Sequence, residues 1–321
     1  MNILIIKLGA LGDVVMATPL IAAIQRAHPN ADFHLLTTAP FGPLFAEWNA
    51  LGVSARPRRG LANTARTLRW IRRLACARIY DLQGNDRTAV LCALSGAPVR
   101  VGNHARFPYT HHPTEPWTGQ DHIFERMTAV LAAAGVHGVD ALPLLPIADA
   151  DRGAVDDWLA RQALGKGTFV LLHANASTSR PEKKWPHFGA LGRRLAAAGL
   201  CPVWIGAGPD APENERLTTT AGGIDATDAF SIPALAELGR RARFAVTNDS
   251  GPMHVLSAAS IPVFGLFGPS DWRRNHALGQ REYVIACVEQ VPEFAGARKG
   301  DCLSRVSSEM VWGRIEASGV L

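Results

Sequence analysis

The sequence predicts an α/β protein built from two doubly wound, Rossmann-like domains. Short apolar runs are followed by glycine-rich turns and amphipathic helices, and this βαβ pattern restarts in the second half of the chain. The 321 residues are enough for two cores of roughly 150 residues each. Because such sheets bind ligands at the carboxyl ends of their strands, polar residues in the βα turns are the candidate site residues.

The first half begins with a buried strand over 2–8, the turn GALGD and a helix over 14–27. A second strand is expected over 32–38. Residues 77–84 predict a further strand that ends in the polar tip DLQG, and a helix is expected near 121–135. A proline-rich stretch then predicts a linker, so the first domain is assigned to 1–150.

The second half repeats the pattern, and its elements follow one another at similar spacing. A helix opened by Ser231, with Pro233 in its first turn, is one of them. The others are helices over 151–163, 187–199, 213–221 and 252–260 and strands over 168–174, 201–207, 243–248 and 261–268.

The first βα turn spells neither a P-loop nor G-x-G-x-x-G, so it does not predict nucleotide binding. What it offers is Asp13 at the start of a helix. One interpretation is an N-cap, which aspartate performs well. The other is a carboxylate kept ionised by the helix dipole and able to accept a proton.

The stretch VTNDSGPMHVLSAAS, residues 246–260, predicts an anion-binding turn. A strand leads into Asp249, Ser250 and Gly251, and the backbone N–H groups at the start of the next helix have no partners within that helix. Capping explains Asp249 and Ser250, but it gives no reason for His254 in a helix otherwise made of Met, Val, Leu and Ala.

The loop ANASTSRPEKKWP places positive charge near the same sheet edge. Lys183, Lys184 and Trp185 follow the strand over 168–174, where a lysine can meet a diphosphate. Each lysine alone is also compatible with an ordinary surface charge. Together with the anion-binding turn, they give one domain both a cation and N–H donors for phosphate.

Composition narrows the class of protein. With 47% hydrophobic and 19% charged residues the chain is typical of a globular protein, and five scattered cysteines predict no disulfide framework or zinc site. The opening stretch does not match a secretory signal, and no apolar run of about 20 residues occurs, so we expect a cytoplasmic protein.

The net charge of +5 is unevenly distributed. Residues 54–106 hold eleven arginines against Asp81 and Asp86, a local +9. This stretch is either a solvated basic helix or a docking region for something acidic. Nucleic acid is not expected, because aromatic residues are few there and no nucleic-acid-binding signature accompanies the charge.

Several of these segments carry a family resemblance. IIKLGALGDVVMATPLIAAI, EKKWP and VTNDSGPMHVLSAASIPVFGLFGPSD resemble the motifs of glycosyltransferase family 9, the ADP-heptose:lipopolysaccharide heptosyltransferases. DLQG and CLSRVSSEMV are similar to further segments of that family, in the same order. The resemblance implies a GT-B fold, with an acceptor domain (1–150) and a nucleotide-sugar donor domain (151–303) facing a central cleft. It also implies that a C-terminal helix (304–321) packs back on the N-terminal domain.

The resemblance also implies roles for particular residues. Asp13 resembles the family's catalytic base, and Lys183 its phosphate-binding lysine. The implied donor-binding residues are Asp249, Ser250, Gly251, His254, Trp185 and Glu213, of which Glu213 would bind the ribose. The implied acceptor-binding residues are Gly12, Gln83, Asn85 and Arg87.

The implied reaction is inverting transfer of heptose from ADP-heptose to an anionic lipopolysaccharide-core acceptor at the inner membrane face. Asp13 would take the proton of the acceptor hydroxyl, and Lys183 with a helix N-terminus would stabilise the departing diphosphate. No cofactor and no metal is expected, and Asp149-Ala150-Asp151 is treated as a chance D-x-D. Two alternatives remain: a related transferase with another nucleotide sugar or a protein acceptor, and a non-catalytic nucleotide-sugar-binding protein.

Overall fold

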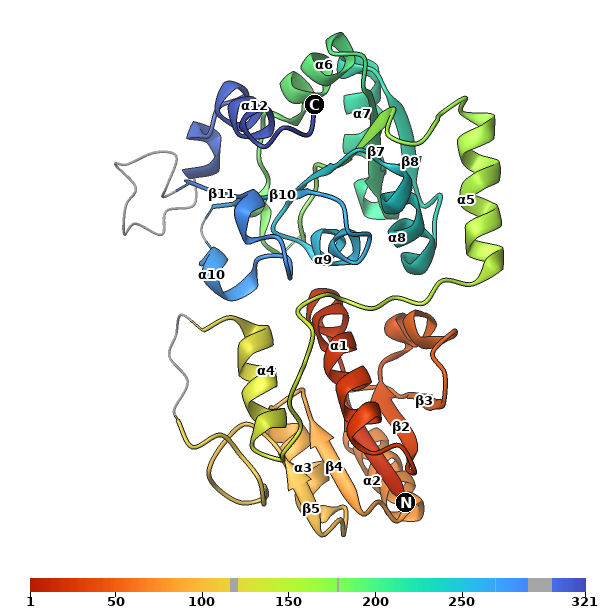
Figure 1. The fold of residues 1–321 in the computed structure, drawn as a ribbon, viewed down its shortest axis with the longest axis vertical. Helices are drawn as coiled ribbons and strands as arrows, with labels where there is room; N and C mark the ends of the chain where they lie inside the picture. The colour runs from red at the N-terminus through yellow and green to blue at the C-terminus, as the bar shows by residue number, and fades with distance from the viewer. Residues whose placement is uncertain (116–120, 178, 269, 288–301) are drawn as a thin grey trace. The chain divides into compact units, whose positions relative to one another are not determined.

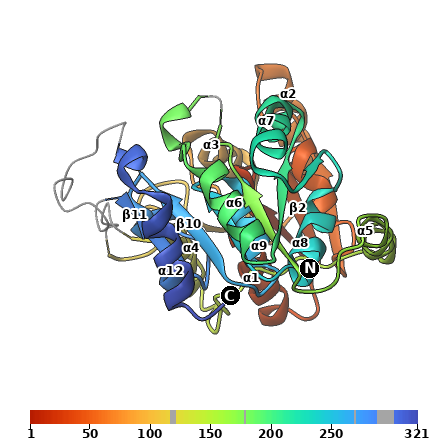
Figure 2. The ribbon, with the colours of Figure 1, turned by 90° about the horizontal axis from the view of Figure 1, so that it is seen from above.

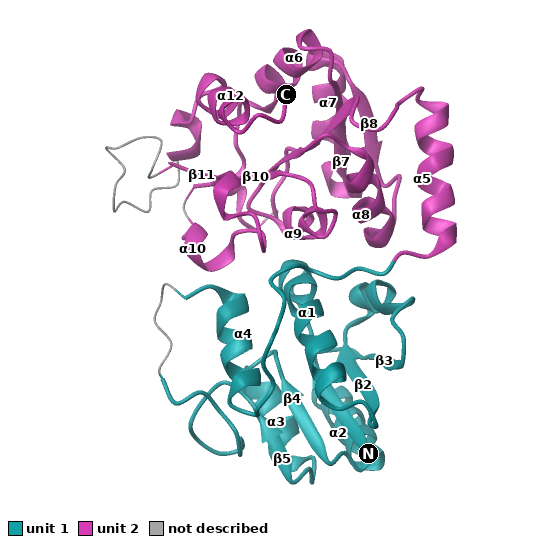
Figure 3. Ribbon diagram, viewed as in Figure 1, with its two compact units in different colours: residues 1–146 teal, residues 147–321 magenta. Residues whose placement is uncertain are grey.

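The computed structural model describes residues 1–115, 121–177, 179–268, 270–287 and 302–321. These residues divide into two compact units, Met1–Pro146 and Ile147–Leu321 (Figure 3). The sequence placed the boundary slightly later, after Ala150. Each unit contains a parallel sheet with helices on both faces, as predicted for doubly wound domains.

The first unit has a five-stranded sheet in the order β3-β2-β1-β4-β5 (Figure 1). Its strands are β1 (Asn2–Ile6), β2 (Asp32–Thr37), β3 (Leu51–Ala55), β4 (Arg78–Asp81) and β5 (Val99–Val101). Its helices are α1 (Leu11–Ala27), η1 (Ala39–Phe45), α2 (Leu61–Leu74), α3 (Asp86–Leu94) and α4 (Ile123–Ala132).

Helices α1 and α4 pack against each other on one face of this sheet, and α2 and α3 contact each other on the opposite face. Right-handed βαβ crossovers require this division, because the strand order reverses direction after β3. Alternate side chains of β1 point to opposite faces of the sheet. On one face, Leu4 and Ile6 pack with Ile71 of α2 and Leu91 of α3.

The second unit has a six-stranded parallel sheet in the order β11-β10-β9-β6-β7-β8. Its strands are β6 (Phe169–His173), β7 (Cys201–Gly206), β8 (Ile224–Thr227), β9 (Ala245–Asn248), β10 (Val263–Phe267) and β11 (Val284–Ala286). Its α-helices are α5 (Asp149–Arg161), α6 (Phe188–Ala197), α7 (Ala211–Ala221), α8 (Ile232–Arg241), α9 (Gly251–Ser257), α10 (Trp272–Asn275) and α12 (Ser308–Ala317). Short 3₁₀ helices are η2 (Pro181–Lys183), η3 (Gly208–Asp210), η4 (Arg281–Tyr283) and η6 (Cys302–Arg305).

Two apolar layers cover this second sheet. Phe169 and Leu171 of β6 pack with α5, α8 and α9, whereas Val170 and Leu172 pack with α6 and α12. The alternation explains why β6 is a continuous apolar run, since a strand buried on both faces has no polar side.

Helix α12 packs within the second unit. Val311, Trp312 and Ile315 are buried in the same core cluster as Phe188 and Leu191, and α12 contacts α6 (Figure 2). These contacts make α12 part of the second unit's core. The expectation that the C-terminal helix also packs back on the first domain stays a prediction.

No helix among the described residues is both long enough and apolar enough to span a bilayer.

Candidate active site

The turn after β1 is fixed by hydrogen bonds to the neighbouring strand ends. The Leu8 N–H donates to Gln83 Oε1 at 2.8 Å, and the Thr38 hydroxyl donates to the Leu8 carbonyl at 3.1 Å. Gly9 has φ +140°, and a Cβ there would lie 2.9 Å from the Phe41 ring, so glycine is required. The turn is thereby held in one position relative to the sheet.

Asp13 lies in the first turn of α1 but does not cap it. The N-cap position belongs to Ala10, which makes no side-chain capping bond. The N-cap interpretation of Asp13 is therefore wrong, and its side chain, 31% exposed, remains available for chemistry.

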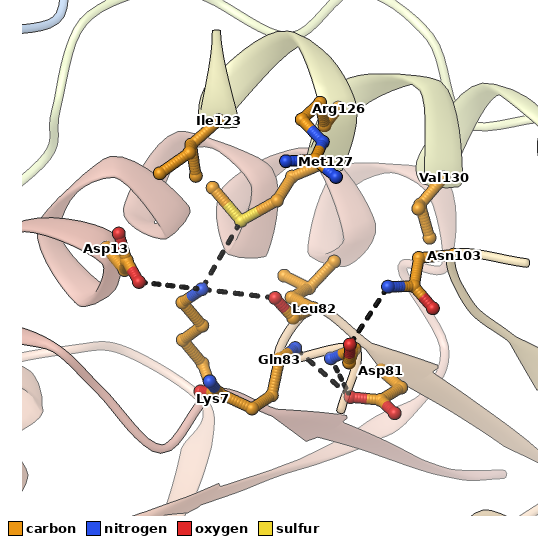
Figure 4. Close-up of a pocket in the computed structure, with 11 residues that line it drawn as sticks. Lys7, Asp13, Asp81, Leu82, Gln83, Asn103, Ile123, Arg126, Met127 and Val130 are labelled. Atoms are coloured by element: carbon orange, nitrogen blue, oxygen red, sulfur yellow. Dashed lines mark hydrogen bonds and ion pairs between the residues drawn. The ribbon is translucent and has the colours of Figure 1, made fainter. Parts of the chain in front are cut away.

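Asp13 opens on a pocket of about 200 Å³ within the first unit (Figure 4). The pocket is walled by the ends of β1 and β4, the first turn of α1, the segment after β5, and α4. Its polar lining residues are Lys7, Asp13, Asp81, Gln83, Asn103 and Arg126. Asn103 donates from Nδ2 to the Gly84 carbonyl at 2.9 Å, which fixes the orientation of its amide.

Lys7 is the buried cation of this pocket, with 3% of its surface exposed. Its ammonium donates to the Leu82 carbonyl at 3.1 Å and lies 4.0 Å from Asp13 Oδ2. Burial lowers the pKa of Lys7, and the charges of Asp13 and Asp81 oppose that effect. Lys7 was not predicted as a site residue, although a lysine directly after an apolar strand was the available signal.

Asp81 shapes the DLQG turn from inside the protein. It accepts the Gln83 and Gly84 N–H groups at 3.1 and 2.9 Å and the Tyr109 hydroxyl at 2.5 Å. Burial nevertheless raises the pKa of Asp81, and these hydrogen bonds only reduce the effect. Asp81 therefore serves the turn that brings Gln83 into the pocket.

The four predicted acceptor-binding residues differ in position. Gln83 lines the pocket, whereas Gly12, Asn85 and Arg87 are not among its lining residues. Gly12 is buried in α1, and Asn85 caps α3 by accepting the Thr88 N–H at 3.0 Å. Arg87 donates to the Pro57 carbonyl at 3.3 Å. Contacts of these residues with an acceptor stay predictions.

Basic side chains follow β3, next to the turn that carries Lys7. Arg56 stacks over the Trp70 ring at 4.6 Å, and Arg58 and Arg59 are exposed. A Cβ built on Gly9 would lie 3.6 Å from Arg58 Nη1. Part of the arginine-rich stretch therefore lies beside the carboxyl end of β1.

The second unit brings Lys183 and Asp249 together. Lys183 Nζ donates to Asp249 Oδ2 at 2.6 Å, and the Ser270 hydroxyl donates to the same oxygen at 2.5 Å. The Asp249 side chain is 7% exposed and that of Lys183 is 17% exposed. The neighbouring Lys184 instead donates to Asn175 Oδ1 at 2.8 Å.

Trp185 anchors this loop from the core. It is 2% exposed, its backbone N–H donates to Asn248 Oδ1 at 3.0 Å, and its indole N–H donates to the Val306 carbonyl at 2.6 Å. The prediction that Trp185 takes part in donor binding stays a prediction, and its buried indole offers little surface to a ligand. Trp185 instead fixes the loop that carries Lys183.

The segment at the start of α9 is only partly exposed. Ser250 occupies the N-cap without a side-chain capping bond, and Gly251 is half-buried. His254 is 5% exposed, and α9 has only seven residues. Side chains around this turn therefore matter more than the dipole of so short a helix.

Sequence reasoning missed His173 and Asp210. His173 ends β6, with Nδ1 3.0 Å from Ser250 Oγ and Nε2 3.7 Å from Asp210 Oδ2. Burial acts to raise the pKa of Asp210, but hydrogen bonds from His173 and the Ala207 N–H, with nearby positive charge, lower it overall. A histidine at the carboxyl end of an apolar strand was the signal for this pair.

Glu213 lies in the first turn of α7 and pairs with Arg216. The two Arg216 nitrogens donate to its carboxylate at 2.7 and 2.9 Å, and these bonds lower the pKa of Glu213. Its predicted contact with a ribose stays a prediction.

The described residues show no grouping of three or more His, Cys, Asp or Glu that could hold a metal ion. The D-x-D carboxylates are engaged in the protein: Asp149 pairs with Arg152 at 3.3 Å, and Asp151 accepts the Ser231 hydroxyl at 2.7 Å.

Comparison with known families decides the assignment. The family described as glycosyltransferase family 9 (heptosyltransferase) matches residues 64–302. The chain belongs to this family. It is therefore a glycosyltransferase of the heptosyltransferase group, as the motifs predicted.

Relatives agree with this assignment over nearly the whole chain. Lipopolysaccharide heptosyltransferase 1 of Salmonella typhimurium is 28% identical, covering 90% of this chain and 95% of its own. The Pseudomonas aeruginosa enzyme of the same name is 26% identical, covering 88% of this chain and 82% of its own.

Solved structures confirm the GT-B fold. A family 9 glycosyltransferase from Veillonella parvula has a TM-score of 0.82 at 22% identity, covering 98% of this chain and 96% of its own. ADP-heptose lipopolysaccharide heptosyltransferase II of E. coli has a TM-score of 0.77 at 19% identity, covering 99% and 98%.

Proposed function

We propose that this glycosyltransferase transfers heptose from ADP-heptose to a lipopolysaccharide inner-core acceptor, with inversion at the anomeric carbon. The observation that carries the proposal is the setting of Asp13: a partly exposed carboxylate that lines a pocket and has a buried ammonium behind it. A general base needs such an accessible, ionised oxygen.

In the proposed reaction the acceptor hydroxyl oxygen attacks the anomeric carbon of the donor. Asp13 takes the hydroxyl proton as the new glycosidic bond forms. The bond to the diphosphate breaks, and ADP leaves with the bonding electrons. Negative charge grows on the diphosphate as this bond breaks. A cation that binds the departing diphosphate more tightly than it binds the intact donor lowers the activation barrier.

Lys183 supplies that charge in the second unit. Its ammonium is held by Asp249 and is more exposed than the carboxylate that holds it. A diphosphate is a stronger competitor for the ammonium than solvent, so donor binding draws Lys183 toward phosphate. Ser250 and Gly251 line the same turn, and His254 follows them in the first turn of α9.

The acceptor assignment rests on charge. Exposed Arg58 lies next to the turn that precedes Asp13, Arg59 beside it in sequence is also exposed, and Gln83 lines the pocket itself. Phosphorylated and acidic core sugars would be attracted to such a surface, as would the anionic face of a membrane. We therefore propose a cytoplasmic enzyme that associates peripherally with the inner membrane.

Two measurements test the proposal. The first is thermal stabilisation by ADP-heptose against ADP-glucose and UDP- and GDP-sugars; stronger stabilisation by another sugar nucleotide would favour the related-transferase alternative. The second is transfer to a core acceptor with and without a chelator. Binding of ADP-heptose without turnover on any core acceptor would favour the non-catalytic alternative, and loss of rate with the chelator would overturn the metal-free reaction.

A further inference from the structure

Lys7 is a buried charge in the pocket that the reaction proposed above does not yet use. We propose that Lys7 is a positioning residue whose fixed positive charge holds the Asp13 carboxylate in place, and that it sets the lower end of the pH range in which the enzyme works. This inference rests on the proposed role of Asp13 as the base.

The geometry gives Lys7 little freedom to move. Its ammonium donates to the backbone carbonyl of Leu82 and lies 3.7 Å from Met127 Sδ on α4. Figure 4 shows the ammonium between that carbonyl and the Asp13 carboxylate. The backbone after Lys7 is tied to Gln83 and Thr38, so the cation is fixed and Asp13 is the partner able to move.

Asp13 is also the carboxylate that forms an ion pair with the Lys7 ammonium. Among the described residues, the ion pair of Lys7 with Asp13 is the only one that Lys7 makes within 4.0 Å. Asp81 is close enough to affect Lys7, but its oxygens accept two backbone N–H groups and the Tyr109 hydroxyl. Burial raises the pKa of Asp81, which weakens it further as a counter-charge.

The other charges that face the pocket come from different elements. Arg126 lines it from α4, and Arg58 approaches the turn from the segment after β3. Lys7 has a fixed ammonium 4.0 Å from the Asp13 carboxylate. Its removal is therefore expected to change the surroundings of Asp13.

The physical consequence has a definite sign. An opposite charge within about 4–6 Å favours the ionised form of a carboxylate. We therefore expect a variant without the ammonium to lose activity at a higher pH on acidification than the wild-type enzyme does. The carboxylate also loses a fixed partner, so fewer molecules hold it in the reactive position.

The experiment compares Lys7→Met and Lys7→Gln with the wild-type enzyme. Both variants remove the charge, and glutamine keeps an N–H donor for the Leu82 carbonyl if methionine does not fold. Single-turnover heptosyl transfer is measured from about pH 5 to pH 9. We expect the acidic limb of the profile to move up by about one pH unit, with a maximum rate lowered roughly tenfold.

Two control variants separate charge from packing. Lys7→Arg keeps the charge, and Met127→Leu removes the sulfur on the other side of the ammonium without changing any charge. Both are expected to keep the acidic limb at the wild-type position. A circular dichroism spectrum and a thermal unfolding profile like those of the wild-type enzyme show that each variant is folded.

Loss of rate with an unmoved acidic limb in the neutral variant that folds would mean a purely structural role, and would overturn the inference. An acidic limb that moves equally in Met127→Leu would overturn it as well. If Asp13 is not the base, Asp13→Asn remains active. That result distinguishes failure of the base assignment from failure of the Lys7 inference. An inactive Asp13→Asn with a wild-type profile in Lys7→Met would reject the Lys7 inference alone.

Discussion

Each unit contains a lysine–aspartate pair, and the two pairs are exposed in opposite ways. In the first unit the Lys7 side chain is 4% exposed and the Asp13 side chain 31%. In the second, Asp249 is 7% exposed and Lys183 17%. The accessible member is a carboxylate in one pair and an ammonium in the other. The same two residue types therefore suit opposite tasks, accepting a proton and binding an anion.

The difference follows from where each residue lies in its sheet. Lys7 directly follows the central strand β1, so its side chain is enclosed between β4 and α4, while Asp13 lies on a helix. In the second unit it is Asp249 that directly follows a central strand, β9, while Lys183 ends the short 3₁₀ helix η2. In each pair the residue at the strand end is the more buried member, and its partner is the more exposed one.

The largest expected effect tests the accessible carboxylate. Asp13→Asn keeps the size of the side chain but cannot take a proton, so kcat is expected to fall roughly 10³-fold. Stabilisation by ADP-heptose, which we propose binds to the second unit, is expected to be unchanged. A kcat within tenfold of wild type would show that Asp13, the more exposed member of the first pair, is not the base.

The next effect tests the accessible ammonium. Lys183→Met is expected to lower kcat/KM for the donor about 10²-fold, because charge on the departing diphosphate loses its cation. The matched control is Lys184→Met, one residue away, whose ammonium is bonded to Asn175 rather than to a carboxylate. Equal losses in the two variants would show that general positive charge, and not the Lys183–Asp249 pair, matters.

A smaller effect concerns Glu213, in the first turn of α7. If Glu213 accepts a ribose hydroxyl, Glu213→Gln costs about 1 kcal/mol of ADP binding, the usual value of one hydrogen bond. The loss is expected to disappear with the matching deoxyribose analogue of ADP, which lacks that hydroxyl. A loss of the same size with both ligands would assign the residue to its bond with Arg216 alone.

Local sequence patterns predicted much of the fold and singled out Asp13 of the first pair and both members of the second. The turns after β1 and β9 were readable because glycine, aspartate and the following helix lie within a few residues. The edge strands β3, β5, β8 and β11 were missed. They are three to five residues long, too short for periodicity to distinguish them from loops.

Burial over long sequence separations could not be predicted. Trp185 in a polar loop suggested a ligand contact, but its indole bonds to Val306, 121 residues away. Lys7, which contacts Leu82 and Met127, and His173, which contacts Ser250 and Asp210, depend in the same way on strands that are adjacent only in the folded sheet. These are the residues that set the environment of the predicted ones.

The smallest effect concerns Asp210, whose carboxylate lies 3.7 Å from His173. It tests whether the charge of Asp210 stabilises the fold. The folded state lowers the pKa of Asp210, so its contribution to stability is present above the unfolded value and is lost as pH falls through the folded value. Asp210→Asn is therefore expected to lower Tm by about 2 °C at pH 7 and by less near pH 3.5. The control is Asp157→Asn, exposed on α5, for which no pH-dependent difference is expected. A loss in Asp210→Asn that is equal at both pH values would mean that its bond to the Ala207 N–H, and not its charge beside His173, stabilises this turn.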